Sequence, residues 1–343
     1  MKNIIKIAFI IVAGILVACN NQEPVFPDYY YTSVYFPIQY PARTLILGEY
    51  SEGDNSMDLE GRFEIGVTMS GVYSNKVDRK VYFEIDNSLL DNVANVRALP
   101  ATHYTLELAS PVTIPAGSMK GRITVQLTEA FFNDTLAIAP VKNTNYVIPL
   151  VITQIENLDS LLSGIPAVQS PRVHAIEDWE ALPQDFTMYG IKYMNEYHGH
   201  YLRRGVDVMT KSSGETVSST YHADYVVRDE LVMLTTSGRN KVMYENMVRR
   251  GTEGSPGNVK MELNFSDGNT GSISGVRDGQ YNVSGVGKFV PDGDEWGGKA
   301  QDVIYLDYSY TDVANSETHA VKDTLVIRDR AAIFEEYSVA LFD

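Results

Sequence analysis

The stretch Phe63-Glu64-Ile65-Gly66-Val67-Thr68-Met69 places an apolar residue at every second position. Because successive side chains of a β-strand point to opposite faces, this spacing predicts a strand with one buried face. Runs with the same period occur at residues 81–85, 123–127 and 148–152. Such strands recur at regular spacing over residues 30–155, which predicts a two-sheet β-sandwich.

The second half of the chain alternates again, with glycine-rich turns between the runs. Alternating runs occur at 259–265, 304–310 and 325–327, and the turns lie at 266–271 and 291–298. About eight strands in roughly 160 residues are typical of an antiparallel barrel or a curled sheet. The sequence therefore predicts an all-β protein in which a sandwich is followed by an antiparallel β-barrel.

A segment without strong periodicity separates the two halves. It contains Gly164, Pro166, Pro171 and Pro183, which favour a linker. The predicted organisation is a signal peptide at 1–18, a lipidated tether at 19–29, a sandwich at 30–156, a linker at 157–185 and a barrel at 186–343.

Composition and charge exclude several classes of protein. Apolar residues make up 44% and charged residues 21% of the 343 residues, as in ordinary globular proteins. The 44 acidic against 28 basic residues give a formal net charge of −16. This acidic balance argues against nucleic acid as a partner, because nucleic-acid binders need a basic face.

The N-terminus has the pattern of a bacterial lipoprotein signal. Lys2 and Lys6 form a short basic region, and Ile4 to Val17 is apolar but too short for a comfortable membrane span. Leu16-Val17-Ala18-Cys19 matches a lipobox, and Cys19 is the only cysteine of the chain. We expect Cys19 to carry a lipid anchor that is the chain's only contact with the membrane. The alternative is an ordinary signal peptide with an accidental cysteine.

No motif of catalysis or metal binding stands out in the sequence. There is no Gly-x-Ser-x-Gly elbow, and the only cysteine is assigned to the anchor. With 44 acidic residues, the availability of a carboxylate pair does not indicate glycoside hydrolysis. Asp292-Gly293-Asp294-Glu295 lacks the spaced ligands of a calcium loop. We therefore expect no enzyme activity, no metal and no cofactor.

One segment combines aromatic, imidazole and guanidinium groups. His198 and His200 would share one face of a strand, but zinc needs three or four ligands. Tyr197, Tyr201 and Arg203 accompany them. The cluster predicts either the lining of a barrel mouth or the solvated face of a strand.

The two tryptophans have different surroundings. Trp296 lies in the polar, glycine-rich loop 294–298, where no demand of a core is visible. We interpret it as a platform for a sugar ring or as a lid over the barrel end. Trp179 lies between acids in the linker, where packing across the domain seam is expected. The candidate ligand residues are Trp296, Tyr197, His198, His200, Tyr201 and Arg203.

The first half also resembles a known family. Val34-Tyr35-Phe36-Pro37, the turn Asp86-Asn87-Ser88-Leu89-Leu90, Leu99-Pro100 with Tyr104, and Thr113-Ile114-Pro115-Ala116-Gly117-Ser118 carry the resemblance. They are similar to the Ig-like N-terminal domain of unknown function in Bacteroidetes surface lipoproteins. That domain precedes chitinase-like endoglycosidases in some proteins and binding modules in others. The resemblance implies an Ig-like sandwich.

The second half resembles a lipocalin-like companion domain of the same lipoproteins. Tyr189-Gly190-Ile191-Lys192-Tyr193, Tyr197-His198-Gly199-His200-Tyr201 and Asp323-Thr324-Leu325-Val326-Ile327-Arg328-Asp329 carry this resemblance. Together the two matches imply a glycan-utilisation or adhesin-like setting at the outer membrane, beside a SusC/SusD-type importer. Only Glu23 follows Cys19 closely, so exposure at the cell surface is expected but the periplasmic face stays open.

These observations lead to a function and its alternatives. We expect a non-catalytic cell-envelope lipoprotein that binds an oligo- or polysaccharide, so that a weak site held at the membrane raises the local glycan concentration. The alternative is an adhesin-like or structural subunit that binds a protein partner. A hydrolase with an unrecognised carboxylate pair is a third class.

Overall fold

The computed structural model describes residues 27–107, 109–139, 145–250, 253–265, 269–276, 281–332 and 335–342. It is nearly all β, with 57% of the chain in strands and 8% in helices. The predicted anchor residue Cys19 lies outside the described residues. None of the helices in the described part of the chain combines the length and apolar character that a membrane span requires.

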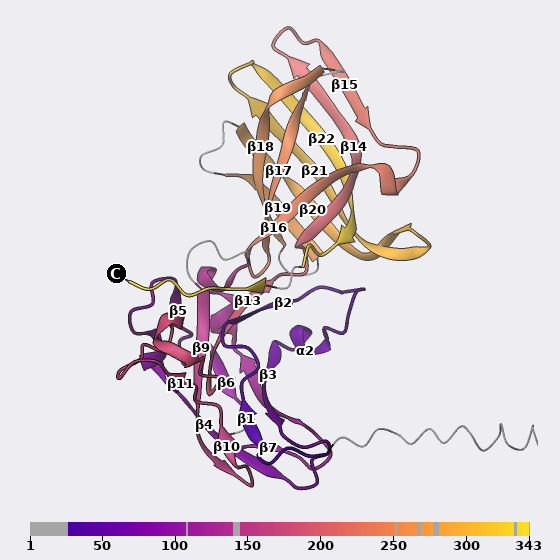
Figure 1. The fold of residues 1–343 in the computed structure, drawn as a ribbon. Coiled ribbons are helices and arrows are strands. Elements are labelled where there is room, and N and C mark those ends of the chain that lie inside the picture. The colour runs from indigo at the N-terminus through magenta and orange to yellow at the C-terminus, as the bar shows by residue number, and fades with distance from the viewer. Residues whose placement is uncertain are drawn as a thin grey trace, which may run out of the picture.

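The N-terminal part is a β-sandwich (Figure 1). Its first sheet has the order β10-β1-β3-β8-β6. The strands are β1 (Ser33–Tyr35), β3 (Arg62–Ser70), β6 (Tyr104–Leu106), β8 (Lys120–Leu127) and β10 (Ser160–Leu161). Burial alternates along β3, where Phe63, Ile65, Val67 and Met69 face the core as the period-2 pattern predicts.

The second sheet of the sandwich has the order β23-β2-β13-β9-β4-β7, and β5 pairs with β9. The strands are β2 (Pro41–Ile46), β4 (Arg79–Ile85), β5 (Val96–Ala98), β7 (Val112–Ile114), β9 (Asn145–Glu156), β13 (Phe186–Met194) and β23 (Glu335–Glu336). Val81, Phe83 and Ile148 of this sheet pack against the apolar face of β3 in one core.

Short elements complete the sandwich and join the strands of the barrel. They are α2 (Ser56–Leu59), α3 (Glu129–Phe132), η1 (Asn87–Leu90), η2 (Thr135–Ala137), η3 (Ile176–Asp178), η4 (Val226–Arg228), and the strands β11 (Ile165–Pro166) and β12 (Trp179–Ala181), which pair with each other.

The C-terminal part is a closed barrel of eight strands, as the sequence predicts. The ring runs β14-β16-β17-β18-β19-β20-β21-β22 and closes where β22 pairs with β14. A further strand, β15 (Thr216–Tyr221), pairs with the second half of β14. The ring strands are β14 (Gly199–Lys211), β16 (Glu230–Gly238), β17 (Lys241–Arg250), β18 (Glu253–Phe265), β19 (Thr270–Gly275), β20 (Tyr281–Trp296), β21 (Lys299–Asp312) and β22 (Glu317–Asp329).

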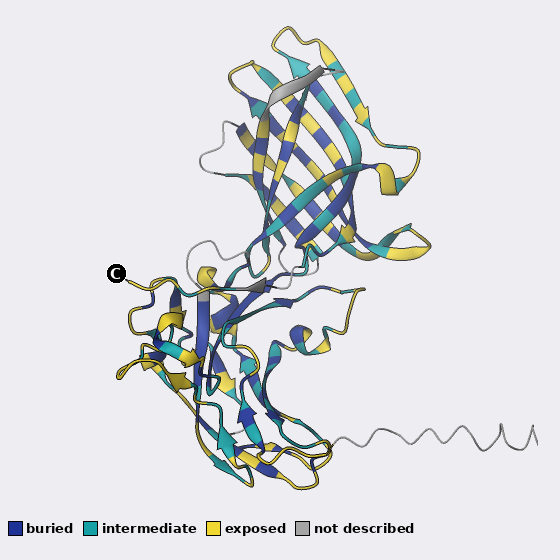
Figure 2. Cartoon of the chain, in the orientation of Figure 1, coloured by how far each residue is buried: buried dark blue, intermediate teal, exposed yellow. Residues whose placement is uncertain are grey.

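Side chains fill the inside of the barrel. Figure 2 shows buried and exposed residues alternating along its strands. Tyr244, Met261, Phe265 and Tyr308 belong to one buried apolar cluster that the strands enclose. The interior is therefore a packed core over much of its length.

The domain boundaries of the structure differ from the sequence prediction. Residues 186–194, predicted to open the barrel, form β13 of the sandwich, where β13 pairs with β9 and β2. After the barrel the chain returns: β23 pairs with β2, and Phe342 donates its backbone N–H to Asn92. The predicted linker 157–185 contains β10, which extends the first sheet. The barrel is thus inserted between two strands of the sandwich.

The physical reason lies in the burial of β13. Eight of its nine residues are buried, so it has no solvated face. A strand buried on both faces has no alternation of polarity that would indicate its sheet. The chain crosses between the domains twice, after β13 and after β22, and this double connection constrains their relative placement.

Candidate functional site

A cavity of about 580 Å³ lies where the sandwich meets the barrel. This volume falls within the range of small-ligand sites, which often form at domain interfaces. Its lining comes from the loop after β2, from the β20–β21 hairpin and from the end of β22: Glu49, Tyr50, Ser51, Glu52, Trp296, Gly297, Lys299, Ala300, Gln301, Asp302, Ile327, Arg328, Asp329 and Arg330.

A tight hairpin positions Trp296 at the cavity. Trp296 pairs with Lys299 across the turn, and both Gly297 and Gly298 have positive φ angles of 65° and 75°. Two central residues with positive φ are the requirement of a type I′ turn, which glycine meets without strain. The indole Nε1–H donates to the carbonyl of Ile327 at 2.8 Å, and this bond ties the ring to the neighbouring strand.

Arg330 joins the two domains beneath the cavity. Its Nε donates to the carbonyl of Glu49 at 2.9 Å, and its Nη1 donates to the carbonyl of Glu196. Its Nη2 donates to Asp302 at 2.7 Å. Gly48 leaves room for the guanidinium, because a Cβ there would lie 2.7 Å from the Arg330 Cζ.

Carboxylates from both domains meet beside Arg330. Glu49, Asp292 and Asp302 place oxygen atoms within 4.8 Å of one another, a spacing that could hold a cation. Asp302 is buried and already accepts from Arg330 and from the backbone N–H of Asp292. The guanidinium therefore offsets part of the negative charge, which weakens the group as a metal site.

The cavity wall offers both flat rings and hydrogen-bonding groups. Tyr50 donates its hydroxyl to Glu52 at 3.3 Å. Lys299 and Arg328 contribute exposed side chains to the lining, and Gln301 adds an amide. Such a mixture of aromatic and polar groups suits a ligand with both apolar faces and hydroxyls.

The two predicted histidines have separate partners. His198 is buried, and its Nδ1 accepts from the Thr236 backbone N–H at 3.0 Å. His200 is half-buried, and its Nδ1 lies 2.7 Å from Asp329, a residue of the cavity wall. Only His200 therefore adjoins the cavity.

The buried His198 makes stability sensitive to acid. Burial, followed by the charges of Arg330 and His200, lowers its pKa from 6.5 to about 4. The unfolded chain therefore binds more protons than the folded chain between pH 6.5 and 4, so the free energy of unfolding falls as the pH drops through this window. The full contribution is about 3 kcal/mol. Urea unfolding at pH 7 and pH 4.5 should show a smaller pH effect in His198→Gln. The exposed His222 provides the matched control, His222→Gln.

Tyr197, Tyr201 and Arg203 lie inside the barrel, so neither interpretation of this segment holds for them. Tyr197 stacks on Phe265 with ring centroids 4.2 Å apart. Tyr201 is fully buried and donates its hydroxyl to the carbonyl of Tyr197 at 3.0 Å. These three residues are not part of the lining of the interdomain cavity.

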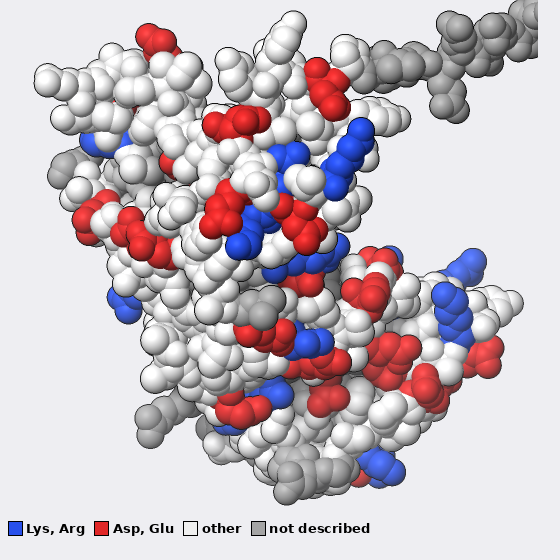
Figure 3. All heavy atoms as spheres, turned by 90° about the horizontal axis from the view of Figure 1, so that it is seen from below, with Lys and Arg blue, Asp and Glu red and all other residues white. Residues whose placement is uncertain are grey.

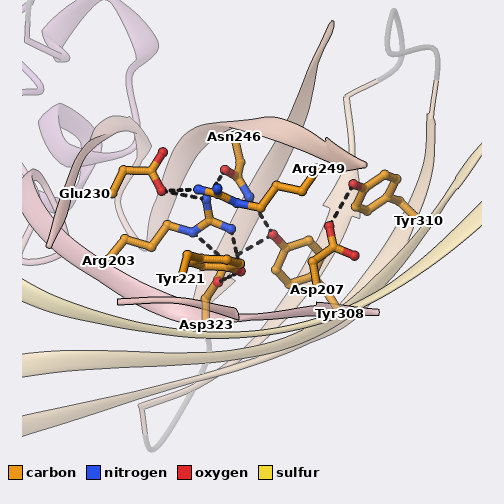
Figure 4. Close-up of polar contacts among 9 residues, drawn as sticks. All are labelled: Arg203, Asp207, Tyr221, Glu230, Asn246, Arg249, Tyr308, Tyr310 and Asp323. Carbon is orange, nitrogen blue, oxygen red and sulfur yellow. Dashed lines mark hydrogen bonds and ion pairs between the residues drawn. The ribbon is translucent and has the colours of Figure 1, made fainter. Parts of the chain in front are cut away.

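Arg203 is the centre of a polar network inside the barrel (Figure 4). Its guanidinium donates to Glu230 at 3.2 Å, to Tyr221 at 2.7 Å and to Asn246. The buried Asp323 lies 3.1 Å from its Nε. The arginine is thus surrounded by oxygen acceptors from four different strands, β15, β16, β17 and β22.

Tyrosine hydroxyls complete this network. Tyr308 and Tyr221 both donate to Asp323, Tyr308 at 3.1 Å. Burial, followed by the charge of Asp323, raises the pKa of Tyr308 above its usual range, so the hydroxyl stays a donor. Arg249 donates to Glu230 and lies over the Tyr221 ring, 3.9 Å from its centroid. The positive charges of the two arginines are thus balanced by the carboxylates of Glu230 and Asp323.

A second polar group lies further along the barrel. His319 is buried with its Nδ1 2.9 Å from Asp207, and Tyr310 donates to the same carboxylate at 3.3 Å. The His319 and Tyr310 rings stack with centroids 4.3 Å apart. Within the described residues, the His319 Nε2 and the hydroxyl of Tyr244 have no hydrogen-bond partner.

The fold and the cavity define a two-domain all-β protein in which a sandwich and a closed barrel share an interdomain site. A family model described as a domain of unknown function (DUF5627) matches residues 196–331. A second model, described as an N-terminal domain, matches residues 29–159. The bounds of the first match agree with the insertion of the barrel after β13.

A solved structure of unknown function from Bacteroides ovatus is similar over nearly the whole chain. The two sequences are 34% identical, the match covers 92% of this chain and 99% of that chain, and the TM-score is 0.83. The chain belongs to the same family as this Bacteroides protein. No curated protein matches the sequence.

Two further solved structures are only weakly similar to this chain. A multidomain protein including DUF1735 from Bacteroides ovatus is 14% identical with a TM-score of 0.41, over 90% of this chain and 99% of that chain. An auxiliary nutrient binding protein from Bacteroides thetaiotaomicron is 14% identical with a TM-score of 0.36, over 88% and 94%. Likenesses at this level carry no argument about the present site.

Proposed function

We propose that this chain is a non-catalytic lipoprotein, anchored to the outer membrane through Cys19, that captures glycans in the interdomain cavity. The observation that carries the proposal is the combination, in one cavity of about 580 Å³, of the rings of Trp296 and Tyr50 with carboxylate, amide and ammonium groups. Aromatic faces stack on the C–H faces of sugars, and polar side chains fix the hydroxyls.

Placement at the membrane allows a binding site of low affinity to be effective. A binding site tethered to a surface holds its ligand at a high effective concentration. A neighbouring SusC/SusD-type importer would then receive the captured glycan. The lipobox and the family resemblance of the sequence support this setting.

Replacement of Trp296 should weaken glycan binding. In Trp296→Ala we expect the Kd of a bound glycan to rise about tenfold or more, because a central aromatic contact is worth about 1.4 kcal/mol or more. The measurement is a screen of host and plant polysaccharides with residues 20–343, followed by calorimetry on the ligands that bind. Tyr50→Ala should act in the same direction without touching the Trp296–Ile327 hydrogen bond.

Trp179 provides the matched control. It lies in β12 on the sandwich and donates its Nε1–H to the carbonyl of Arg172 at 2.9 Å, away from the cavity lining. Trp179→Ala should bind as the parent does. Equal affinities of the parent and Trp296→Ala, both folded, would exclude the cavity as the site, and release of shorter sugars would instead identify a hydrolase.

The alternative function, binding of a protein partner, has a weaker structural basis. A shallow hollow of about 430 Å³ lies on the barrel wall beside the exposed side chains of Val286 and Tyr305. Lys288, Asp307 and Lys322 flank it. The apolar area is small and interrupted by charges, whereas protein interfaces usually expose larger apolar patches.

A further inference from the structure

Four strongly exposed tyrosines gather at the end of the sandwich where the described chain begins. Tyr29, Tyr30, Tyr31 and Tyr73 are 73%, 93%, 63% and 79% exposed. The first three precede β1, which starts at Ser33, and the fourth lies in the loop after β3. We call this set the tyrosine patch. None of the four tyrosines lines the interdomain cavity or belongs to the core of the barrel.

Hydrogen bonds hold the two segments of the patch together. Tyr29 donates its backbone N–H to the carbonyl of Gly71 at 2.8 Å. Tyr73 donates its backbone N–H to the Asp28 carboxylate at 2.6 Å. Gly71 has a φ of +96°, and a Cβ there would collide with the carbonyl oxygen of Tyr31. The sequence therefore builds this close approach, and the two segments that carry the tyrosines are held side by side.

The position of the patch relative to Cys19 suggests what covers it. Seven residues separate Cys19 from Pro27. Even fully extended, this stretch spans at most roughly 30 Å. A lipid on Cys19 would thus keep the patch close to the bilayer surface, and tyrosine favours the boundary between lipid and water because its ring is apolar and its hydroxyl polar.

We propose that the tyrosine patch lies on the lipid surface of the membrane that holds the anchor, which adds a second membrane contact to the lipid anchor expected from the sequence. This inference rests on the lipidation of Cys19 but not on glycan binding. Figure 3 views the molecule from below: white side chains project at the edge where the described chain begins, an acidic group lies beside them, and acidic and basic groups mix across the rest of that face. Lys76 in the loop of Tyr73 is exposed and suits anionic headgroups.

This contact would orient the whole molecule. The barrel lies at the opposite end of the sandwich from the point where the tail leaves (Figure 1). With the patch on the lipid, the barrel and the interdomain cavity point away from the membrane, where a polymer can reach them. A tether alone would leave the orientation free.

The only cysteine allows a direct test. The mature chain, residues 19–343, is coupled through the Cys19 thiol to maleimide lipids in phosphatidylethanolamine–phosphatidylglycerol vesicles. A reporter is introduced as Tyr73→Trp, and doxyl-labelled lipids quench tryptophans that touch the bilayer. The matched reporter is Tyr225→Trp, at a tyrosine that is 65% exposed on the barrel. The signal of Trp179 and Trp296 is subtracted with the parent.

We expect strong quenching and a blue shift for Tyr73→Trp, and neither for Tyr225→Trp. Equal quenching of the two reporters would overturn the proposal. In Tyr73→Trp with Tyr29→Ser, Tyr30→Ser and Tyr31→Ser, quenching should fall; if it persists in folded protein, the tether alone sets the contact. A blue shift that grows with protein concentration without vesicles would identify a second copy as the occupant, and would also overturn the proposal.

Discussion

Asp323→Asn should destabilise the barrel by about 3 kcal/mol, because it leaves a buried arginine without its closest charge partner. Arg203 is fully buried and lies 3.1 Å from Asp323. Asparagine has the same shape as aspartate, so the change removes charge without creating a cavity. Glu230 still contacts Arg203, which keeps the expected loss at the lower end of the range for broken buried pairs.

Barrel unfolding can be followed separately from sandwich unfolding. Trp296 is in the barrel and Trp179 is on the sandwich. In a Trp179→Phe background, urea unfolding monitored by tryptophan fluorescence therefore reports the barrel. A midpoint shift without a change of slope would indicate lost stability rather than a different unfolded state.

The neighbouring pair Asp307 and Lys322 supplies a control with the same chemistry. It joins β21 to β22 at 3.0 Å, whereas the buried pair joins β14 to β22, and both of its side chains are exposed. Exposed pairs contribute less than about 1 kcal/mol, so Asp307→Asn should have little effect. Replacing both partners of the buried pair, as Arg203→Met with Asp323→Leu, should recover much of the loss. Equal effects at positions 323 and 307 would contradict the role of burial.

The sequence predicts the strands well where one face is buried and the other solvated. The alternation at 63–69 and 304–310 corresponds to β3 and β21, which cover a core on one side. The alternation of polar and apolar residues does not identify the sheet of β13, because β13 is buried on both faces. The sequence pattern also misplaces Arg203, because an arginine in an alternating strand is expected to face water. Its partner Asp323 is 120 residues away, so no local pattern indicates the pair.

The candidate site was only partly accessible to sequence reasoning. A tryptophan in a polar glycine-rich loop has no core to fill, which makes Trp296 a candidate, and the structure places it in the cavity lining. The sequence does not indicate Glu49 and Tyr50, because they come from the other domain and no local pattern marks them. Arg330 contacts the Glu49 carbonyl across 281 residues, a distance that no motif spans.

Arg330→Met should loosen the junction of the two domains and open the cavity. The change removes hydrogen bonds to the carbonyls of Glu49 and Glu196 and leaves Asp302 buried without its cation. An unpaired buried carboxylate costs about 3–5 kcal/mol. We therefore expect the barrel to unfold at a lower urea concentration than the sandwich. The fluorescence of Trp296 and that of Trp179 should then show two separate unfolding transitions, whose midpoints lie further apart than in the parent.

Two further variants distinguish the effect of the Arg330 charge from the effect of its hydrogen bonds to the other domain. Arg328→Met is the same substitution two residues earlier, at an exposed side chain whose nearest acid, Asp329, is 3.8 Å away, and it should leave the stability nearly unchanged. Arg330→Met with Asp302→Asn removes the buried charge and should regain stability, but it cannot restore the bonds to the loop after β2. Because that loop carries Tyr50 of the cavity lining, glycan affinity should be low in Arg330→Met and stay low in the double variant, although its barrel is stable again. Restored affinity would mean that Arg330 serves the fold alone, and that the cavity forms without this bridge between the domains.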